Sequence, residues 1–282
     1  SEVVAQDEEL LPWKTLPWFG VIKAVLRSDT FDVIPTALKL QIQNFIKPKM
    51  PIGMKLDVKD PKFINLEIKT TVRFDRNVTQ QNPATIKGLV ESAVSTFNTN
   101  NLDKFFKTFR QSKLMKDIDA SDVSIVSNWT TMRMVKEVSP DINKSFTKEI
   151  NFNNALKRDN PVDELTQDAF VSYSTPAVSS ETFVFDDITG CSIRDDSNGV
   201  LQVVTVTDTD INVLNQNVGT VDYESGKVSI EGLLITKYTG GFTSGSIKIF
   251  ARPKNTDIDG RREDILRIRD EDTIITVEEL RL

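Results

Sequence analysis

The sequence predicts an α+β protein in which an N-terminal part of helices and a small sheet is followed by a mainly β C-terminal part. Residues 64–74 alternate strictly between apolar and polar side chains, which is the period of a half-buried strand. Residues 82–97 instead place their apolar side chains on one helical stripe. After Pro140, short β-branched runs are separated by turn clusters rich in Asp, Asn, Ser and Gly.

The first residues predict an extended arm. Pro12 and Pro17 interrupt an apolar stretch that contains Trp13, Trp18 and Phe19, and two prolines so close together argue against a continuous helix. Two interpretations stay open: the arm packs its aromatic residues on its own domain, or it docks on a neighbouring subunit, since Trp is enriched in interface hot spots. Because the chain begins with serine, we expect it to be part of a longer polypeptide or a processed product.

Residues 35–47 predict an amphipathic helix that begins after a proline and ends before another. Its apolar residues at helical spacing are Leu38, Ile42, Phe45 and Ile46. A turn at Pro51 and Gly53 should then lead into a short strand, Lys55–Val58.

The middle of the chain predicts a unit of strand, helices and strand. The first helix begins at Asn82, a good N-cap, with Pro83 at the favoured first position. A second helix is expected after Asn101, with Leu102, Phe105, Phe106 and Phe109 on one side, and a short third helix capped by Ser112. Residues 122–138 predict a long strand, so the helices should pack on one face of a small sheet.

The last half predicts short strands, including a hairpin in GTVDYESGKVSIEGLLI around Glu224-Ser225-Gly226. The polar segment 141–168 gives no clear pattern. We therefore expect three parts: residues 1–60, an N-terminal arm and helix; residues 61–139, an α+β domain; and residues 140–282, a β-rich domain.

Composition argues against several functions. The net charge is −6, from 35 basic and 41 acidic residues, and the basic residues are scattered, whereas nucleic-acid binding needs a concentrated positive field. No apolar run approaches the roughly 18 residues that span a bilayer. The single Cys191 allows no internal disulfide, which fits a reducing compartment. We expect no nucleic-acid, membrane or small-molecule partner.

The absence of histidine removes the usual base for a serine or cysteine nucleophile and the usual nitrogen ligand for metals. We therefore expect no catalytic residue, no cofactor and no metal site. A carboxylate-based hydrolase stays an alternative, although Asp186-Asp187 and Asp195-Asp196 lie in turn contexts that favour Asp for local hydrogen bonds. Residues 255–260 resemble the start of a calcium loop, but its twelfth position is Leu266 instead of Glu.

A second alternative is a carbohydrate- or cell-surface-binding β module, which would need exposed aromatic residues. The β-rich half contains Tyr173, Tyr223 and Tyr238 but no tryptophan, because Trp129 is the last one in the chain. This supply of aromatic residues is small for glycan binding.

Four segments between about Ile34 and Ile258 together resemble the baseplate wedge proteins of T4-type contractile-tail bacteriophages, within the baseplate J-like family. They are IPTALKLQIQNFIKPKMPIGMKLDVKDPKFINLEIKTTVRFD, NPATIKGLVESAVSTF, TTMRMVKEV and VGTVDYESGKVSIEGLLI. None is a catalytic signature, and their order is more specific than any one of them.

The resemblance implies a non-enzymatic scaffold in the virion tail baseplate, assembled in the host cytoplasm. In such a family, copies pair and link adjacent wedges into a ring around the central hub, which rearranges when the sheath contracts. The implied partners are a second copy, most simply in a homodimer, and other baseplate wedge proteins. We expect the surfaces bearing Trp13, Trp18 and Phe19, and edge strands of the β-rich half, to meet these partners.

Overall fold

The computed structural model describes residues 2–4, 20–28, 31–51, 53–158, 176–207, 210–239, 245–260 and 263–280. The predicted interface residues Trp13, Trp18 and Phe19 lie outside these ranges. Among the described residues, no helix combines the length and the apolar character needed to cross a membrane.

The N-terminal elements are β1 (Glu2–Val4), β2 (Val21–Val25), α1 (Thr36–Ile46), the 3-10 turn η2 (Lys47–Lys49) and β3 (Lys55–Lys59). The middle elements are β4 (Lys62–Asp75), α2 (Pro83–Asn101), β5 (Thr108–Arg110), α3 (Gln111–Asp119) and β6 (Ile125–Val138). The β-rich part contains β7 (Ser145–Asn151), β8 (Val178–Ser180), β9 (Phe183–Phe185), β10 (Ile188–Asp195), β11 (Val200–Val206), β12 (Ile211–Asp222), β13 (Lys227–Leu234), β14 (Lys237–Tyr238) and β15 (Ile247–Ala251). The last elements are β16 (Asp257–Asp259), β17 (Asp264–Arg267), the 3-10 turn η3 (Asp270–Asp272) and β18 (Thr273–Leu280).

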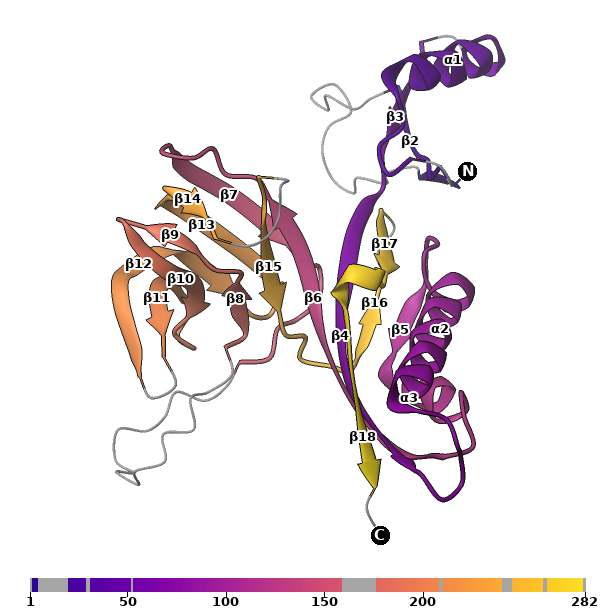
Figure 1. The fold of residues 1–282 in the computed structure, drawn as a ribbon. Coiled ribbons are helices and arrows are strands. Elements are labelled where there is room, and N and C mark those ends of the chain that lie inside the picture. The colour runs from indigo at the N-terminus through magenta and orange to yellow at the C-terminus, as the bar shows by residue number, and fades with distance from the viewer. Residues whose placement is uncertain are drawn as a thin grey trace.

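Within the described residues, one hydrogen-bonded sheet of thirteen strands runs through most of the molecule, in the order β17-β4-β6-β15-β8-β10-β11-β12-β13-β7. β18 also pairs with β4, and β9 joins β10 to β14. β17 and β18 both run parallel to β4, so the C-terminal strands return to the middle of the chain. Figure 1 shows the β-rich strands on one side of β6, and α1 with β2 and β3 beyond one end of β4.

The helices α2 and α3 cover one face of the sheet formed by β18, β4 and β6 (Figure 1). The alternation in β4 explains this packing, because Ile64, Leu66, Ile68 and Val72 are fully buried on that face. Phe97 of α2 packs edge-on against Phe109, with ring centroids 6.0 Å apart. The α+β fold class, with a mainly β C-terminal part, is confirmed.

Most of the predicted elements are present. α2 begins as expected: Asn82 Oδ1 accepts the Thr85 backbone N–H at 2.8 Å, and Pro83 is the first helical residue. The hairpin also forms, with β12 and β13 joined across residues 223–226. The domain boundaries at 60 and 139 stay a prediction.

The helix predicted after Asn101 is wrong. Asp103 and Phe106 have positive φ angles of 52° and 57°, which a right-handed helix does not allow, and residues 108–110 form β5. The backbone of this segment binds C-terminal partners instead, since Asp103 N–H donates to Leu266 O at 2.8 Å and β5 pairs with β16. Tertiary pairing therefore overrides the local helical pattern.

The cap of α3 also differs from the prediction. The helix begins at Gln111, and the residue before it, Arg110, is extended and makes no side-chain cap hydrogen bond. Ser112 lies inside the first turn, while Leu114 and Ile118 face the core as expected.

Candidate assembly surfaces

The first candidate surface belongs to the part we call the α1 module, which comprises the described residues between Gly20 and Asp60. Here α1 lies on β3, and Gln43 Nε2 donates to Leu56 O at 3.0 Å. No residue of α1 is buried. The buried side chains of the module are instead Ala24, Val25, Ile34 and Val58, so α1 itself offers surface.

That open surface is apolar in several places. Phe45 is 69% exposed, Val33 68% and Leu40 53%. The ammonium group of Lys49 lies 4.3 Å from the ring centroid of Phe45 and covers part of that ring. Large exposed apolar patches on a soluble protein are typical of contact sites for other molecules.

Asp60 fixes the orientation of α1. Its carboxylate accepts the Ile34 backbone N–H at 2.8 Å and the Lys39 ammonium at 2.5 Å. Desolvation by burial opposes ionisation of this carboxyl, but these two hydrogen bonds and the Lys39 charge outweigh it, so the pKa of Asp60 is lowered. The helix is thereby held by its first turn at the end of β3.

The second candidate surface is the outer sheet face, defined as the side chains of β18, β4 and β6 that point away from α2 and α3. Thr70 and Thr130 point towards the helices and are hydrogen-bonded at 2.8 Å. Their neighbours Thr71 and Trp129, which face each other across the two strands, must therefore point outwards. Trp129 is 74% exposed at this position.

An apolar residue of β18 extends the outer sheet face. Thr276 pairs with Thr71, and Ile274, which is 48% exposed, pairs with Lys69 two residues away. Within the described part of the chain, β18 pairs with β4 alone, so its other edge has no strand partner there. The same holds for β7, which pairs with β13 alone. Open strand edges can accept a strand from another chain.

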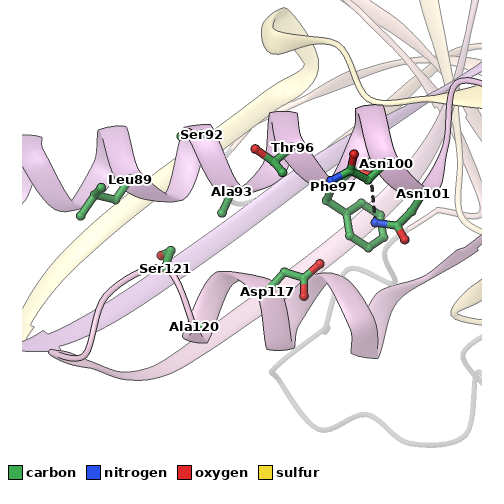
Figure 2. A pocket seen from close by; sticks show the side chains of 10 residues that line it. All are labelled: Leu89, Ser92, Ala93, Thr96, Phe97, Asn100, Asn101, Asp117, Ala120 and Ser121. Atoms are coloured by element: carbon green, nitrogen blue, oxygen red, sulfur yellow. Dashed lines mark hydrogen bonds between the residues drawn. The ribbon is translucent and has the colours of Figure 1, made fainter.

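A groove between α2 and α3 has a volume of about 460 Å³ (Figure 2). Small and polar residues line most of it, and Asp117 is its single ionisable side chain. Figure 2 shows the hydrogen bond from Asn101 Nδ2 to Phe97 O, which is 3.1 Å long and closes the last turn of α2. This groove lies between two helices, and no two acidic side chains meet in it.

The adjacent acids considered in the sequence lie in structural settings. Asp195 is buried and accepts hydrogen bonds from the Val178 backbone N–H at 2.7 Å and the Tyr223 hydroxyl at 2.8 Å. Asp186 and Asp187 both have positive φ angles, in the turn between β9 and β10. The Asp195 carboxylate therefore holds strands together, whereas Asp186 and Asp187 are residues of a tight turn.

The calcium-like segment is part of a strand pair. Asp257 and Asp259 lie at the two ends of β16, and Asp259 accepts a hydrogen bond from the Thr108 hydroxyl at 2.7 Å. Among the residues that the structure describes, no group of three or more Cys, Asp or Glu side chains could hold a metal ion.

The two exposed surfaces were not singled out by sequence reasoning. Phe45 was expected on the apolar stripe of its helix, and the structure places it on the open side of α1. The exposure of Trp129 could have been predicted from the sequence. Thr130, Met132 and Met134 alternate along the inner face of β6, so residue 129 lies on its outer face.

These surfaces carry exposed apolar side chains. A match to a protein family indicates the class of protein that the chain resembles. Residues 62–137, from the start of β4 almost to the end of β6, match the family described as baseplate structural protein gp6, C-terminal domain III. The match covers only this middle part of the chain, and it shows that this part resembles a structural protein of a bacteriophage baseplate.

One relative is the baseplate wedge protein gp6 of Enterobacteria phage T4. The two chains are 22% identical over 191 residues, which are 67% of this chain and 28% of the relative. The chain thus spans little more than a quarter of that relative's length. The resemblance to baseplate wedge proteins is confirmed.

Proposed function

We propose that this chain is a non-enzymatic scaffold that pairs with a second copy and links neighbouring wedges into a ring around the central hub. The ring rearranges when the sheath contracts, and assembly takes place in the host cytoplasm. The observation that carries the proposal is the exposed Trp129 on the outer sheet face, together with the open apolar side of α1.

Two surfaces on different parts of the fold suit a ring-building subunit. A closed two-fold contact uses one patch of each subunit, so a chain of contacts needs a second patch. The α1 module and the outer sheet face meet this requirement. Figure 1 shows α1 beyond one end of β4, and Trp129 lies in β6 opposite Thr71. The arm residues Trp13, Trp18 and Phe19 remain predicted contacts outside the described residues.

The non-enzymatic part of the proposal rests on how the acids are used. Asp195 binds a backbone N–H and a tyrosine hydroxyl, and Asp259 binds a threonine hydroxyl, so neither is poised opposite a second acid. The chain has no histidine to act as a base in their place.

Co-assembly tests the proposal. The purified chain is mixed with each of the other baseplate proteins of the same phage, and the products are sized by sedimentation velocity. We expect a larger complex with at least one of them, and a loss of that complex in Phe45→Glu or Trp129→Glu. Gln41→Glu, on the exposed side of the same helix, and Ile188→Glu, at the exposed start of β10, are the matched controls. A chain that sediments alone with every candidate would contradict the proposal.

A further inference from the structure

The basic residues are scattered over the chain as a whole, but one segment is an exception. Residues 104–116 read KFFKTFRQSKLMK and contain five lysines or arginines and no acid. The whole chain has a net charge of −6, so the other residues together are even more acidic than that value indicates. The sign of the charge on this segment is therefore opposite to that of the rest of the protein.

The fold exposes most of these cations. Lys104 lies in the loop after α2, Arg110 ends β5, and Lys113 and Lys116 lie one turn apart on α3; all four residues are exposed. Phe106, in the same loop as Lys104, is 51% exposed. We call these five side chains the β5–α3 surface.

The loop and α3 lie next to each other. The Lys113 ammonium donates a hydrogen bond to Asn101 Oδ1 at the last residue of α2, from which the loop leaves. Figure 1 shows α2, β5 and α3 on the side of β4 away from the β-rich strands. The β5–α3 surface is therefore separate from the outer sheet face, whose side chains point away from these helices.

Nearby carboxylates leave this surface positive. Asp103 is bound by Arg27, and Asp117 lies in the groove between α2 and α3. Among the described residues, none of the four cations forms an ion pair, although Arg110 faces Asp257 across the β5–β16 pair. Neighbouring like charges repel one another, so an acidic ligand would relieve this repulsion.

Phe106 is held in a conformation that displays its ring. Its φ angle is 57°, which bulky side chains rarely adopt. The backbone on either side is fixed by C-terminal partners, because Phe105 forms a bridge with Ile265 and Lys107 O accepts the Gly260 N–H at 3.0 Å. An exposed aromatic side chain in a fixed basic loop is suited to contact an apolar side chain of a ligand.

We propose that the β5–α3 surface binds an acidic segment of another protein, with carboxylates at its four cations and an apolar side chain against Phe106. The inference rests on the proposed scaffold function and deepens it, because it states the chemistry of one partner. A long nucleic acid fits less well, since it would extend beyond these cations along a chain whose net charge is −6.

Binding of labelled probes to the full chain tests the inference. The first probe is a glutamate-rich peptide that contains two leucines. The comparison probes are the same peptide with glutamine in place of glutamate, and a single-stranded DNA of the same net charge. We expect fluorescence anisotropy to show that the glutamate peptide binds most tightly, and that salt weakens its binding because exposed charges are screened. No binding of this peptide, or equal or tighter binding of the DNA, would overturn the inference.

Charge reversal locates the site. Lys104→Glu with Lys116→Glu should weaken binding of the glutamate peptide by about 10-fold, because each substitution replaces an attraction by a repulsion. Lys148→Glu with Lys237→Glu changes the net charge equally at two exposed positions of the β-rich part, and should weaken binding by less than about 2-fold because distant charges are screened. Equal losses in the two double variants would show dependence on net charge alone and contradict the proposed site.

The role of the ring is tested by Phe106→Asn, because asparagine adopts positive φ angles more readily than phenylalanine and so preserves the loop. This variant should weaken binding of the leucine-containing peptide by about 3-fold or more, since apolar anchors contribute strongly to binding. A glutamate peptide with serine in place of leucine should bind the variant and the parent equally well. An equal loss for both peptides would contradict the contact between Phe106 and an apolar side chain.

The result can be separated from the fate of the scaffold proposal. Peptide binding at this surface by a chain that stays monomeric would sustain the inference where the scaffold proposal fails. A complex with another baseplate protein that forms equally well in Lys104→Glu with Lys116→Glu, in a chain that binds no glutamate peptide, would contradict this inference alone. A dimer that these two substitutions dissociate would assign the surface to a second copy and overturn the inference.

Discussion

Arg267 in β17 donates from Nη1 to both carboxylate oxygens of Asp32, at 2.8 Å each, across 235 positions of the chain. The same guanidinium donates to Asn65 Oδ1 at 2.8 Å and lies 4.1 Å from the ring centroid of Phe63. One C-terminal side chain thus connects the start of β4 to the segment that leads into α1. Together with the ion pair between Arg27 and Asp103, this contact joins the α1 module to the body.

Arg267→Ala should loosen the α1 module without unfolding the core. The loss of an ion pair and of a ring contact, each partly exposed, amounts to about 1 kcal/mol. We expect faster backbone hydrogen exchange in residues 31–60 and unchanged exchange in α2, measured by mass spectrometry. Arg73→Ala, which removes the more exposed ion pair with Glu278, is the control and should leave exchange in residues 31–60 unchanged.

A buried ion pair between Lys248 and Asp272 holds η3 against β15. The ammonium lies 2.7 Å from Asp272 Oδ1, and both side chains are nearly inaccessible to solvent. Asp272→Ala removes this buried ion pair and also the hydrogen bond from Arg269 Nε, so we expect a loss of about 3 to 5 kcal/mol in the free energy of unfolding by urea. Glu271→Ala, at an exposed neighbouring position, should change that free energy by less than about 0.5 kcal/mol.

Asp264 should make the free energy of unfolding fall as pH rises, which is opposite to the usual effect of an Asp carboxyl. Burial raises the pKa of its carboxyl, although the hydrogen bond from Asn153 and the charge of Lys136 oppose the shift. The folded chain therefore keeps this proton to a higher pH than the unfolded chain does. Its contribution to stability is complete below the ordinary pKa of Asp and is lost as pH rises through the folded-state pKa.

Asp264→Asn isolates this contribution, since an amide of the same shape can still bind Asn153. The difference in unfolding free energy between the variant and the parent should grow in the variant's favour as pH rises through that window, by at most about 1.4 kcal/mol per pH unit. Urea titrations at a series of pH values measure it. A difference that stays constant with pH would show that Asp264 has the same pKa in both states.

Gly226 in the β12–β13 hairpin should tolerate no side chain. Its φ angle is +72°, and a Cβ atom there would lie 2.1 Å from Asn154 O. Gly232 has a similar φ of +67° but no atom within 4 Å of the added carbon. Thermal unfolding should therefore show a loss of about 1 kcal/mol for Gly232→Ala from backbone strain alone, and a clearly larger loss for Gly226→Ala. Equal losses would contradict the close approach to Asn154.

The sequence predicts those elements whose signals are local. The Asn82 cap, the proline after it and the strict alternation in residues 64–74 each act within a few positions, and α2 and β4 form as expected. The segment 102–110 has an equally helical spacing of Leu102, Phe105 and Phe109. Its backbone hydrogen-bond partners, however, are Leu266 and β16, which lie more than 140 residues away. No local sequence pattern indicates them.

The candidate surfaces were predictable to a smaller extent. The outward position of Trp129 follows from the phase of its own strand, but the exposure of Phe45 does not, because an apolar stripe on a helix normally packs on a core. Among the described strands α1 packs mainly on β3, and only the tertiary structure shows that its stripe is left partly open.

Self-association is the central claim, and the mass of the purified full chain across a concentration series tests it most directly. Sedimentation equilibrium from low micromolar to high micromolar concentration should show a monomer that converts to a dimer, with the conversion weakened by Phe45→Glu or Trp129→Glu. A strict monomer at every concentration would contradict the account and leave the exposed aromatic surfaces without their proposed role.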